Sequence, residues 1–144
     1  MALVFPNVTG LYAVRAQAAA TSSYVAGKVV SAGPEGEHNA LLVFVNYVKG
    51  DETSLQLKVE ATGDPTSTAS ASVTWYQQLT QTVSGGTVTV APAEYSMTAA
   101  SAATNQPFTF IINPVKGQMY KISVKFTGGS VVGTVGVKAA LGWV

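Results

Sequence analysis

Apolar and polar residues alternate with a period of two along much of this chain, and this pattern constrains the fold more than any other feature. Such alternation is typical of β-strands with one buried and one solvated face. The clearest runs cover residues 54–61, 120–126 and 135–143, and weaker ones cover 73–79, 87–90 and 108–112. Residues 40–47 are apolar on both faces, which predicts a central strand covered on both sides.

Turn residues separate these runs. Lys49 to Glu52 is expected to form a hairpin between two strong strands, and Ser84 to Gly86 another tight turn. The Ala-rich segments 14–20 and 93–103 predict one turn of helix at most. Seven or eight short strands in 144 residues predict an all-β fold: a single-domain antiparallel β-sandwich, jelly-roll-like, with little or no helix.

The organisation along the chain predicts two regions within one domain. Residues 40–144 are expected to form the β-sandwich core, and residues 1–39 an N-terminal arm or outer strand that docks on a neighbour. Deleting the residues before Tyr24 is therefore expected to leave the β-fold intact. The longest apolar run, 40–45, is far shorter than the ~20 residues of a membrane-spanning helix, so no membrane partner is expected.

Charged residues make up only 10% of the chain, whereas about 25% is usual in a soluble domain. Apolar residues reach 47%, and the formal net charge is +1. This balance lacks the basic field that holds nucleic acid. A chain so poor in charge covers its exterior with small polar residues or buries it against partners, which favours a structural, interface-forming protein.

Residues able to do chemistry are scarce. The chain has one histidine, His38, which lies beside Glu35 and Glu37 in a Gly/Pro loop, and it has no cysteine. We interpret that loop as solvated rather than as a metal site or an acid–base pair. Asp51 and Glu52 could hold Ca²⁺, but a charged hairpin tip explains them better. We therefore predict no catalytic residue, no metal site, no cofactor and no enzymatic activity.

Aromatic residues allow a second hypothesis, because exposed rings on a β-sandwich can stack on sugars. Trp75 and Tyr120 lie in phase with the apolar faces of their strands and are predicted to be core, with Tyr76 pointing outward. Tyr76, Tyr95 and Trp143 are the candidate sugar-stacking residues.

Two stretches resemble a known family. One is VNYVKGDETSLQLKVE at 45–60, followed by TWYQ at 74–77, and the other is YKISVK at 120–125 leading to GTVGVKAALGW at 133–143. Both resemble small virion proteins of tailed bacteriophages, in particular capsid decoration (cement) proteins with a jelly-roll-like β-sandwich.

The resemblance implies a non-enzymatic protein that binds the outside of an expanded phage capsid and bridges capsomers to stabilise the shell. It implies the major capsid protein as partner, a homotrimer, synthesis in the host cytoplasm and a final location on the outer capsid surface of the virion. The candidate interface residues, chosen as apolar and outside the expected core, are Leu3, Val4, Phe5, Leu11, Tyr12, Tyr24, Leu141 and Trp143. The alternatives are a carbohydrate-binding or adhesion module of a head fibre or tail, and a tail-tube or baseplate component.

Overall fold

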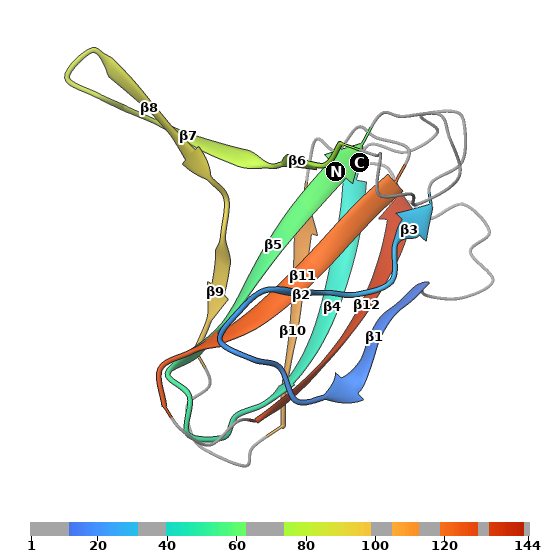
Figure 1. Cartoon of the computed structure of the whole chain (residues 1–144). Coiled ribbons are helices and arrows are strands. Elements are labelled where there is room, and N and C mark those ends of the chain that lie inside the picture. Colours follow the sequence, from blue (N-terminus) through green and yellow to red (C-terminus); the bar gives the residue numbers. More distant parts are fainter. Residues whose placement is uncertain are drawn as a thin grey trace.

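The computed structural model describes residues 12–31, 40–62, 74–98, 105–112, 119–129 and 133–142. Within these ranges the chain forms β-strands and no helix. The strands build two antiparallel sheets, and the apolar faces of these sheets share one core (Figure 1). The predicted all-β sandwich is thereby confirmed.

The first sheet runs in the order β1 (Tyr12–Ala18), β12 (Thr134–Gly142), β4 (Ala40–Val48) and β10 (Asn105–Ile112). In the second sheet, β11 (Met119–Thr127) and β5 (Ser54–Thr62) are central. The short strands β2 (Val25–Ala26) and β3 (Val30–Ser31) flank β11, and β6 (Tyr76–Gln77) and β9 (Tyr95–Met97) flank β5. The remaining strands, β7 (Leu79–Ser84) and β8 (Thr87–Pro92), pair with each other.

The order of the strands is that of a jelly roll. β2 and β3 share one strand position beside β11, and β6 and β9 share another beside β5, which leaves eight positions along the chain. When the strands are numbered by these eight positions, the order of neighbours is 1-8-3-6 in the first sheet and 2-7-4-5 in the second. The first position pairs with the eighth, the second with the seventh, the third with the sixth and the fourth with the fifth. The chain is thus one long hairpin rolled up on itself into two open sheets.

Alternation in the sequence accounts for the core. Leu55, Leu57 and Val59 of β5 are buried, and β11 and β12 contribute their own alternate residues to the same cluster. Between the sheets, the rings of Tyr47 and Phe126 stack with their centroids 5.8 Å apart. β4 lies between β12 and β10, and its first four residues are all buried, which confirms the expected central strand.

The segment 49–53 crosses between the sheets, so the predicted hairpin was wrong. β4 pairs with β10 and β12, whereas β5 pairs with β11, β6 and β9. A turn sequence indicates only that the chain bends, and it does not say which strands pair. The hydrogen-bonding partners of β4 and β5 lie further along the chain. The crossing also buries Glu52, whose side chain is only 1% exposed, where a wet hairpin tip was expected.

Residues 12–18 form an edge strand, although the sequence there predicts at most a turn of helix. β1 pairs with β12, and its Val14 is buried in the core. The amide of Lys28 donates a 2.7 Å hydrogen bond to the carbonyl of Val14, which ties this edge to the chain between β2 and β3. Alanine has little intrinsic preference for strands, so pairing with β12 and burial of Val14 decide the conformation. Residues 12–31 are therefore integral to the sandwich, and removing the chain before Tyr24 would remove one of its strands.

Candidate interaction surface: the β7–β8 arm

The hairpin β7–β8 interrupts a strand at the edge of the second sheet. Gln77 pairs with Glu60 of β5, and the Gln78 amide donates a 3.1 Å hydrogen bond to the Val59 carbonyl. Pairing with β5 resumes only at Tyr95, opposite Leu57. Residues 79–92, which we name the arm, leave this strand as a two-stranded excursion that projects away from the sandwich (Figure 1).

The base of the arm is held by hydrogen bonds. The amide of Ala93 donates to the carbonyl of Gln78 at 2.8 Å, and Nε2 of Gln77 donates to the carbonyl of Ala93 at 3.3 Å. The phenol of Tyr95 donates to Oε1 of Gln78 at 2.9 Å, and the Tyr95 ring stacks on Phe110 at 4.7 Å between centroids. These contacts fix the direction in which the arm leaves the fold.

The tip of the arm is a tight two-residue turn. Gly85 and Gly86 have φ values of 56° and 80°. Positive φ at both central positions defines the type I′ turn, whose twist matches that of the flanking strands. The arm is therefore a regular hairpin from base to tip.

The arm has two unlike faces. Register pairs Leu79 with Pro92, Gln81 with Val90 and Val83 with Val88, so these six side chains share one face. The opposite face carries only hydroxyl side chains and alanine: Thr80, Thr82, Ser84, Thr87, Thr89 and Ala91. We name the first the apolar face and the second the hydroxyl face.

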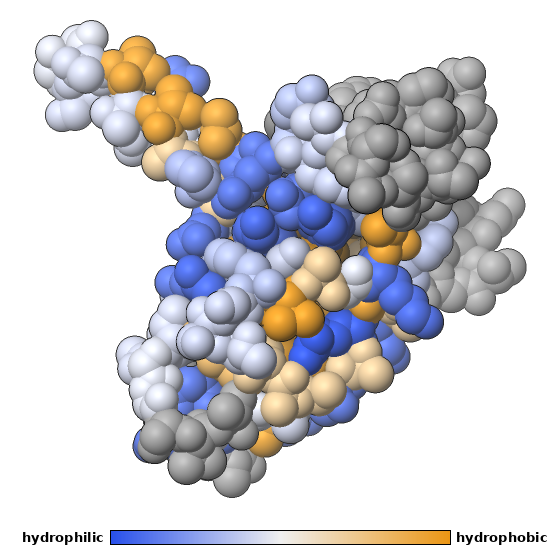
Figure 2. All heavy atoms as spheres, viewed as in Figure 1, coloured by the Kyte–Doolittle hydropathy of each residue, from blue (hydrophilic) through white to orange (hydrophobic). Residues whose placement is uncertain are grey.

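The apolar face is open to solvent. Leu79 is 56% exposed, Val83 67%, and Val88 and Val90 54% each. In Figure 2 these side chains form a hydrophobic group on the projecting hairpin. Fully burying a valine or leucine contributes about 1.5–3 kcal/mol, so covering the exposed half of one contributes about 1 kcal/mol. A two-stranded hairpin alone is marginally stable, and a partner on this face would stabilise it.

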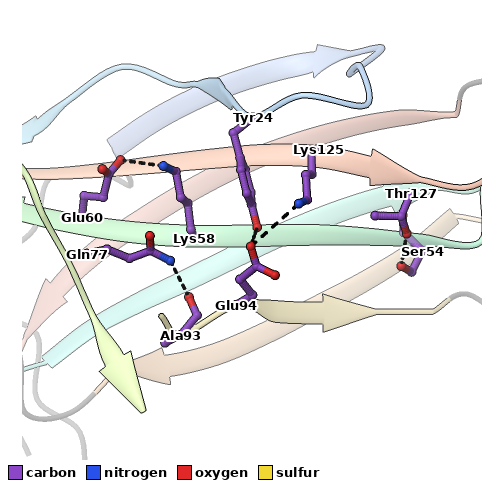
Figure 3. A network of polar contacts seen from close by, with 9 residues as sticks. All are labelled: Tyr24, Ser54, Lys58, Glu60, Gln77, Ala93, Glu94, Lys125 and Thr127. Carbon is purple, nitrogen blue, oxygen red and sulfur yellow. Dashed lines mark hydrogen bonds and ion pairs between the residues drawn. The ribbon is translucent and has the colours of Figure 1, made fainter. Parts of the chain in front are cut away.

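The outer face of the second sheet is, in contrast, occupied by contacts within the chain. The Tyr24 phenol donates to Oε1 of Glu94 at 2.8 Å, and Nζ of Lys125 lies 3.8 Å from the same oxygen (Figure 3). The ammonium groups of Lys58 and Lys125 lie 5.1 and 4.4 Å from the centroid of the Tyr24 ring. Burial, reinforced by the hydrogen bond to Glu94, raises the pKa of Tyr24 above its ordinary value. Tyr24 therefore has partners inside the chain.

A second cluster continues along this face. Oε2 of Glu60 lies 3.6 Å from Nζ of Lys58 and 3.3 Å from Nζ of Lys121. The same ammonium group of Lys121 lies 4.7 Å from the centroid of the Trp75 ring. Trp75 is half-buried on this outer face, so its predicted place in the core was wrong, whereas Tyr120 is fully buried as predicted. Tyr76, which pairs with Ala61 at the edge of this sheet, is 67% exposed.

A shallow groove of about 630 Å³ lies along the first sheet. Phe44, Pro107 and Lys138 are among its lining residues. Two further lining residues are hydrogen-bonded: Nε2 of Gln17 donates to Oγ1 of Thr134 at 2.9 Å, and Nδ2 of Asn46 donates to Oε1 of Gln17 at 3.1 Å. The amides that border the groove are thus already engaged with each other.

Three of the candidate interface residues from the sequence are described by the structure, and none of these three is part of the arm. Tyr12 is 41% exposed on β1, Tyr24 belongs to the network above, and Leu141 is buried in the core. Leu3, Val4, Phe5, Leu11 and Trp143 lie outside the described residues, as do Glu35, Glu37 and His38. Sequence reasoning missed the arm, although the signal is present: 79–92 alternates around Gly85-Gly86 and contains no charged residue.

Across the part of the chain that the structure describes, no three His, Cys, Asp or Glu side chains gather as a metal site would require. No helix capable of spanning a membrane is found among those residues. No protein family, curated protein or solved structure matches this chain. Fold and surface together define a jelly-roll β-sandwich that carries a projecting amphipathic arm.

Proposed function

We propose that this protein is a non-enzymatic virion structural protein that binds the outside of an expanded phage capsid and bridges neighbouring capsomers. Its partner is the major capsid protein, and it acts as a homotrimer. The observation that carries the proposal is the arm: a fixed hairpin whose apolar face is uncovered in the single chain. A protein that keeps such a surface is suited to assembly with others.

The resemblance to decoration proteins supports the same function from a different part of the chain. The resembling stretches, 45–60, 74–77, 120–125 and 133–143, contain most or all of β5, β6, β11 and β12 and the end of β4. All of these except β6 are inner strands of the two sheets. The resemblance therefore concerns the framework, while the arm supplies the contact surface.

The physical role of such a protein is multivalent attachment. Several modest contacts on a symmetric oligomer add up to strong binding when they engage together. The low charge of the chain, 10% of residues, suits contact with unlike neighbours because few charges lose water on binding.

Co-sedimentation tests this function. The purified chain is mixed with expanded phage capsids that lack it, and binding stoichiometry and the heat resistance of the shell are measured. We expect saturable binding at a fixed ratio to capsomers, together with a more heat-resistant shell. A chain that binds no shell would contradict the proposal.

An arm-free variant sharpens the experiment. The backbone hydrogen bond between Gln78 and Ala93 brings these residues together, so residues 79–92 can be replaced by Gly-Gly. The sandwich should keep its thermal unfolding transition, because none of the arm residues belongs to the core cluster. Shell binding should fall at least tenfold, and unchanged binding would remove the arm from the mechanism.

Tyr76 favours one alternative, a glycan-binding module, because its ring is 67% exposed. It does not line the groove on the first sheet, and the neighbouring Trp75 has Lys121 over its ring. A glycan array followed by tryptophan fluorescence tests this alternative. Glycan-dependent quenching that is lost in Tyr76→Ala would favour it over capsid binding.

A further inference from the structure

We propose that copies of this protein assemble with one another through the apolar face of the arm, like face against like face. This inference rests on the proposed function, which includes a homotrimer, and it names the contact that holds that oligomer together. Three properties of the arm support the contact: the distribution of its apolar surface, the absence of charge and the fixed geometry of the hairpin.

The distribution of exposed apolar side chains points to the arm of another copy. Of the seven large hydrophobic residues exposed in the described ranges, four lie on the apolar face of the arm. The other three, Tyr12, Tyr76 and Ile111, lie on separate strands, β1, β6 and β10. Among the described residues, the surface that best complements an arm is therefore a second arm.

Charge supports contact between identical faces. When two copies of one surface meet symmetrically, any charged group near the axis faces its own like charge, which is unfavourable. Residues 79–92 contain no Asp, Glu, Lys or Arg, so this penalty is absent. The outer face of the second sheet has the opposite character, because Lys58, Lys121 and Lys125 lie on it and are paired within the chain.

The geometry of the arm lowers the cost of association. Hydrogen bonds at Gln78 and Ala93 orient the hairpin before any partner arrives, so little conformational entropy is lost on binding. Six residues per strand give a ribbon about 20 Å long. Apolar faces turned toward a common axis close a symmetric oligomer and leave the hydroxyl faces in water. Three such arms around an axis would give the homotrimer of the proposed function.

Disulfide trapping tests the contact directly, because the chain has no cysteine of its own. Val88→Cys places a thiol on the apolar face, and Thr89→Cys places one on the hydroxyl face one residue away. Under mild oxidation we expect V88C to form linked dimers on a non-reducing gel and T89C to remain a single chain. Equal cross-linking of the two variants, or none in V88C, would overturn the inference.

Light scattering on matched charge variants gives an independent measurement. We expect the full chain to have an oligomeric mass, V83D/V88D to be monomeric, and T82D/T89D to keep the mass of the parent. The two double substitutions add the same charge to cross-strand pairs on opposite faces. A monomeric parent chain would overturn the inference, as would equal dissociation of both variants. Circular dichroism and the thermal transition verify that the sandwich is intact.

Shell binding by the same proteins separates this inference from the proposed function. Oligomers that depend on Val83 and Val88 but bind no capsid would support the inference and contradict the function. A monomeric parent chain that binds capsids, and loses this binding only in V83D/V88D, would overturn the inference and assign the apolar face to the capsid instead.

Discussion

The phenol of Tyr47 donates a 2.8 Å hydrogen bond to Oε1 of Glu52, and both side chains are fully buried. The amide of Gly50 donates to the same oxygen at 2.8 Å, and the amide of Gly133 donates to Oε2 at 2.8 Å. One carboxylate thus joins the crossing between β4 and β5 to the start of β12, 81 residues away. The carboxylate accepts the hydrogen bonds that these donors would make to water if they were not buried.

Glu52→Gln should destabilise the protein by about 1–3 kcal/mol, because an amide nitrogen cannot accept from a buried donor that the carboxylate now satisfies. Urea unfolding followed by circular dichroism measures the change. Asp51→Asn, the same isosteric change at the exposed neighbour, is the control and should cost less. Tyr47→Phe should cost much less in an E52Q background than in the parent, and additive losses would argue against a direct coupling.

The contribution of Glu52 should depend on pH. Burial raises the pKa of its carboxyl, but hydrogen bonds from the Gly50, Glu52 and Gly133 amides and the Tyr47 hydroxyl outweigh burial, so the pKa lies below its ordinary value of 4.5. A lowered pKa in the folded state means stability that is present above 4.5 and lost as the pH falls through the folded value. The stability gap between the parent and E52Q should therefore narrow in acid. A gap that widens in acid would show instead that the pKa of the carboxyl in the folded protein lies above 4.5.

Gly133→Ala should destabilise the fold by about 1–3 kcal/mol through overpacking. A Cβ at Gly133 would lie 2.0 Å from the carbonyl oxygen of Val48 and 2.6 Å from the Gly50 amide nitrogen, both rigid backbone atoms. Gly136→Ala, three residues further along in β12, is the matched control, since the nearest neighbour of its Cβ would be the flexible Oε1 of Gln17 at 2.7 Å. Thermal unfolding of both variants measures the loss of stability relative to the parent. Equal losses in the two variants would contradict this steric account.

Alanine at both Gly85 and Gly86 should loosen the arm and leave the sandwich unchanged. Positive φ costs about 1–2 kcal/mol at each residue with a Cβ, while nothing lies within 4 Å of either position to clash. Hydrogen exchange should show faster exchange of the arm amides with an unaltered global transition. Gly85→Asn creates the Asn-Gly pair that type I′ turns favour, and it should protect the arm as well as the parent does.

Removing residues 1–18 should destabilise the sandwich severely. The deletion uncovers the hydrogen-bonding edge of β12 and takes Val14 from the core, and the loss of one buried valine alone costs about 1.5–3 kcal/mol. Removing only residues 1–11 keeps all of β1 and is the control. Equal stability of the two truncations by thermal unfolding would show that β1 is dispensable.

The sequence alone determined the long strands of the sandwich and the side chains that they contribute to the core, as in β5 and β11, but not the edge strand β1. Leu55, Leu57 and Val59 alternate with polar residues, and burial of one face makes that register unambiguous. The double-sided apolar run at 40–47 likewise identified the central strand, and Gly85-Gly86 identified a turn. All these features are local, because periodicity and turn chemistry are read from neighbouring residues.

Only the tertiary structure decided which strands pair, and with that the environment of every polar residue between them. Asp51 and Glu52 read alike as a charged tip, but the crossing between the sheets buries Glu52 under donors from Tyr47 and the distant Gly133. Trp75 matches a core pattern, yet it lies at a sheet edge under Lys121. The arm alternates as a core strand does, and its valines are exposed because no second layer among the described residues covers them. Burial depends on what packs above a strand, and that partner comes from far along the chain or from another molecule.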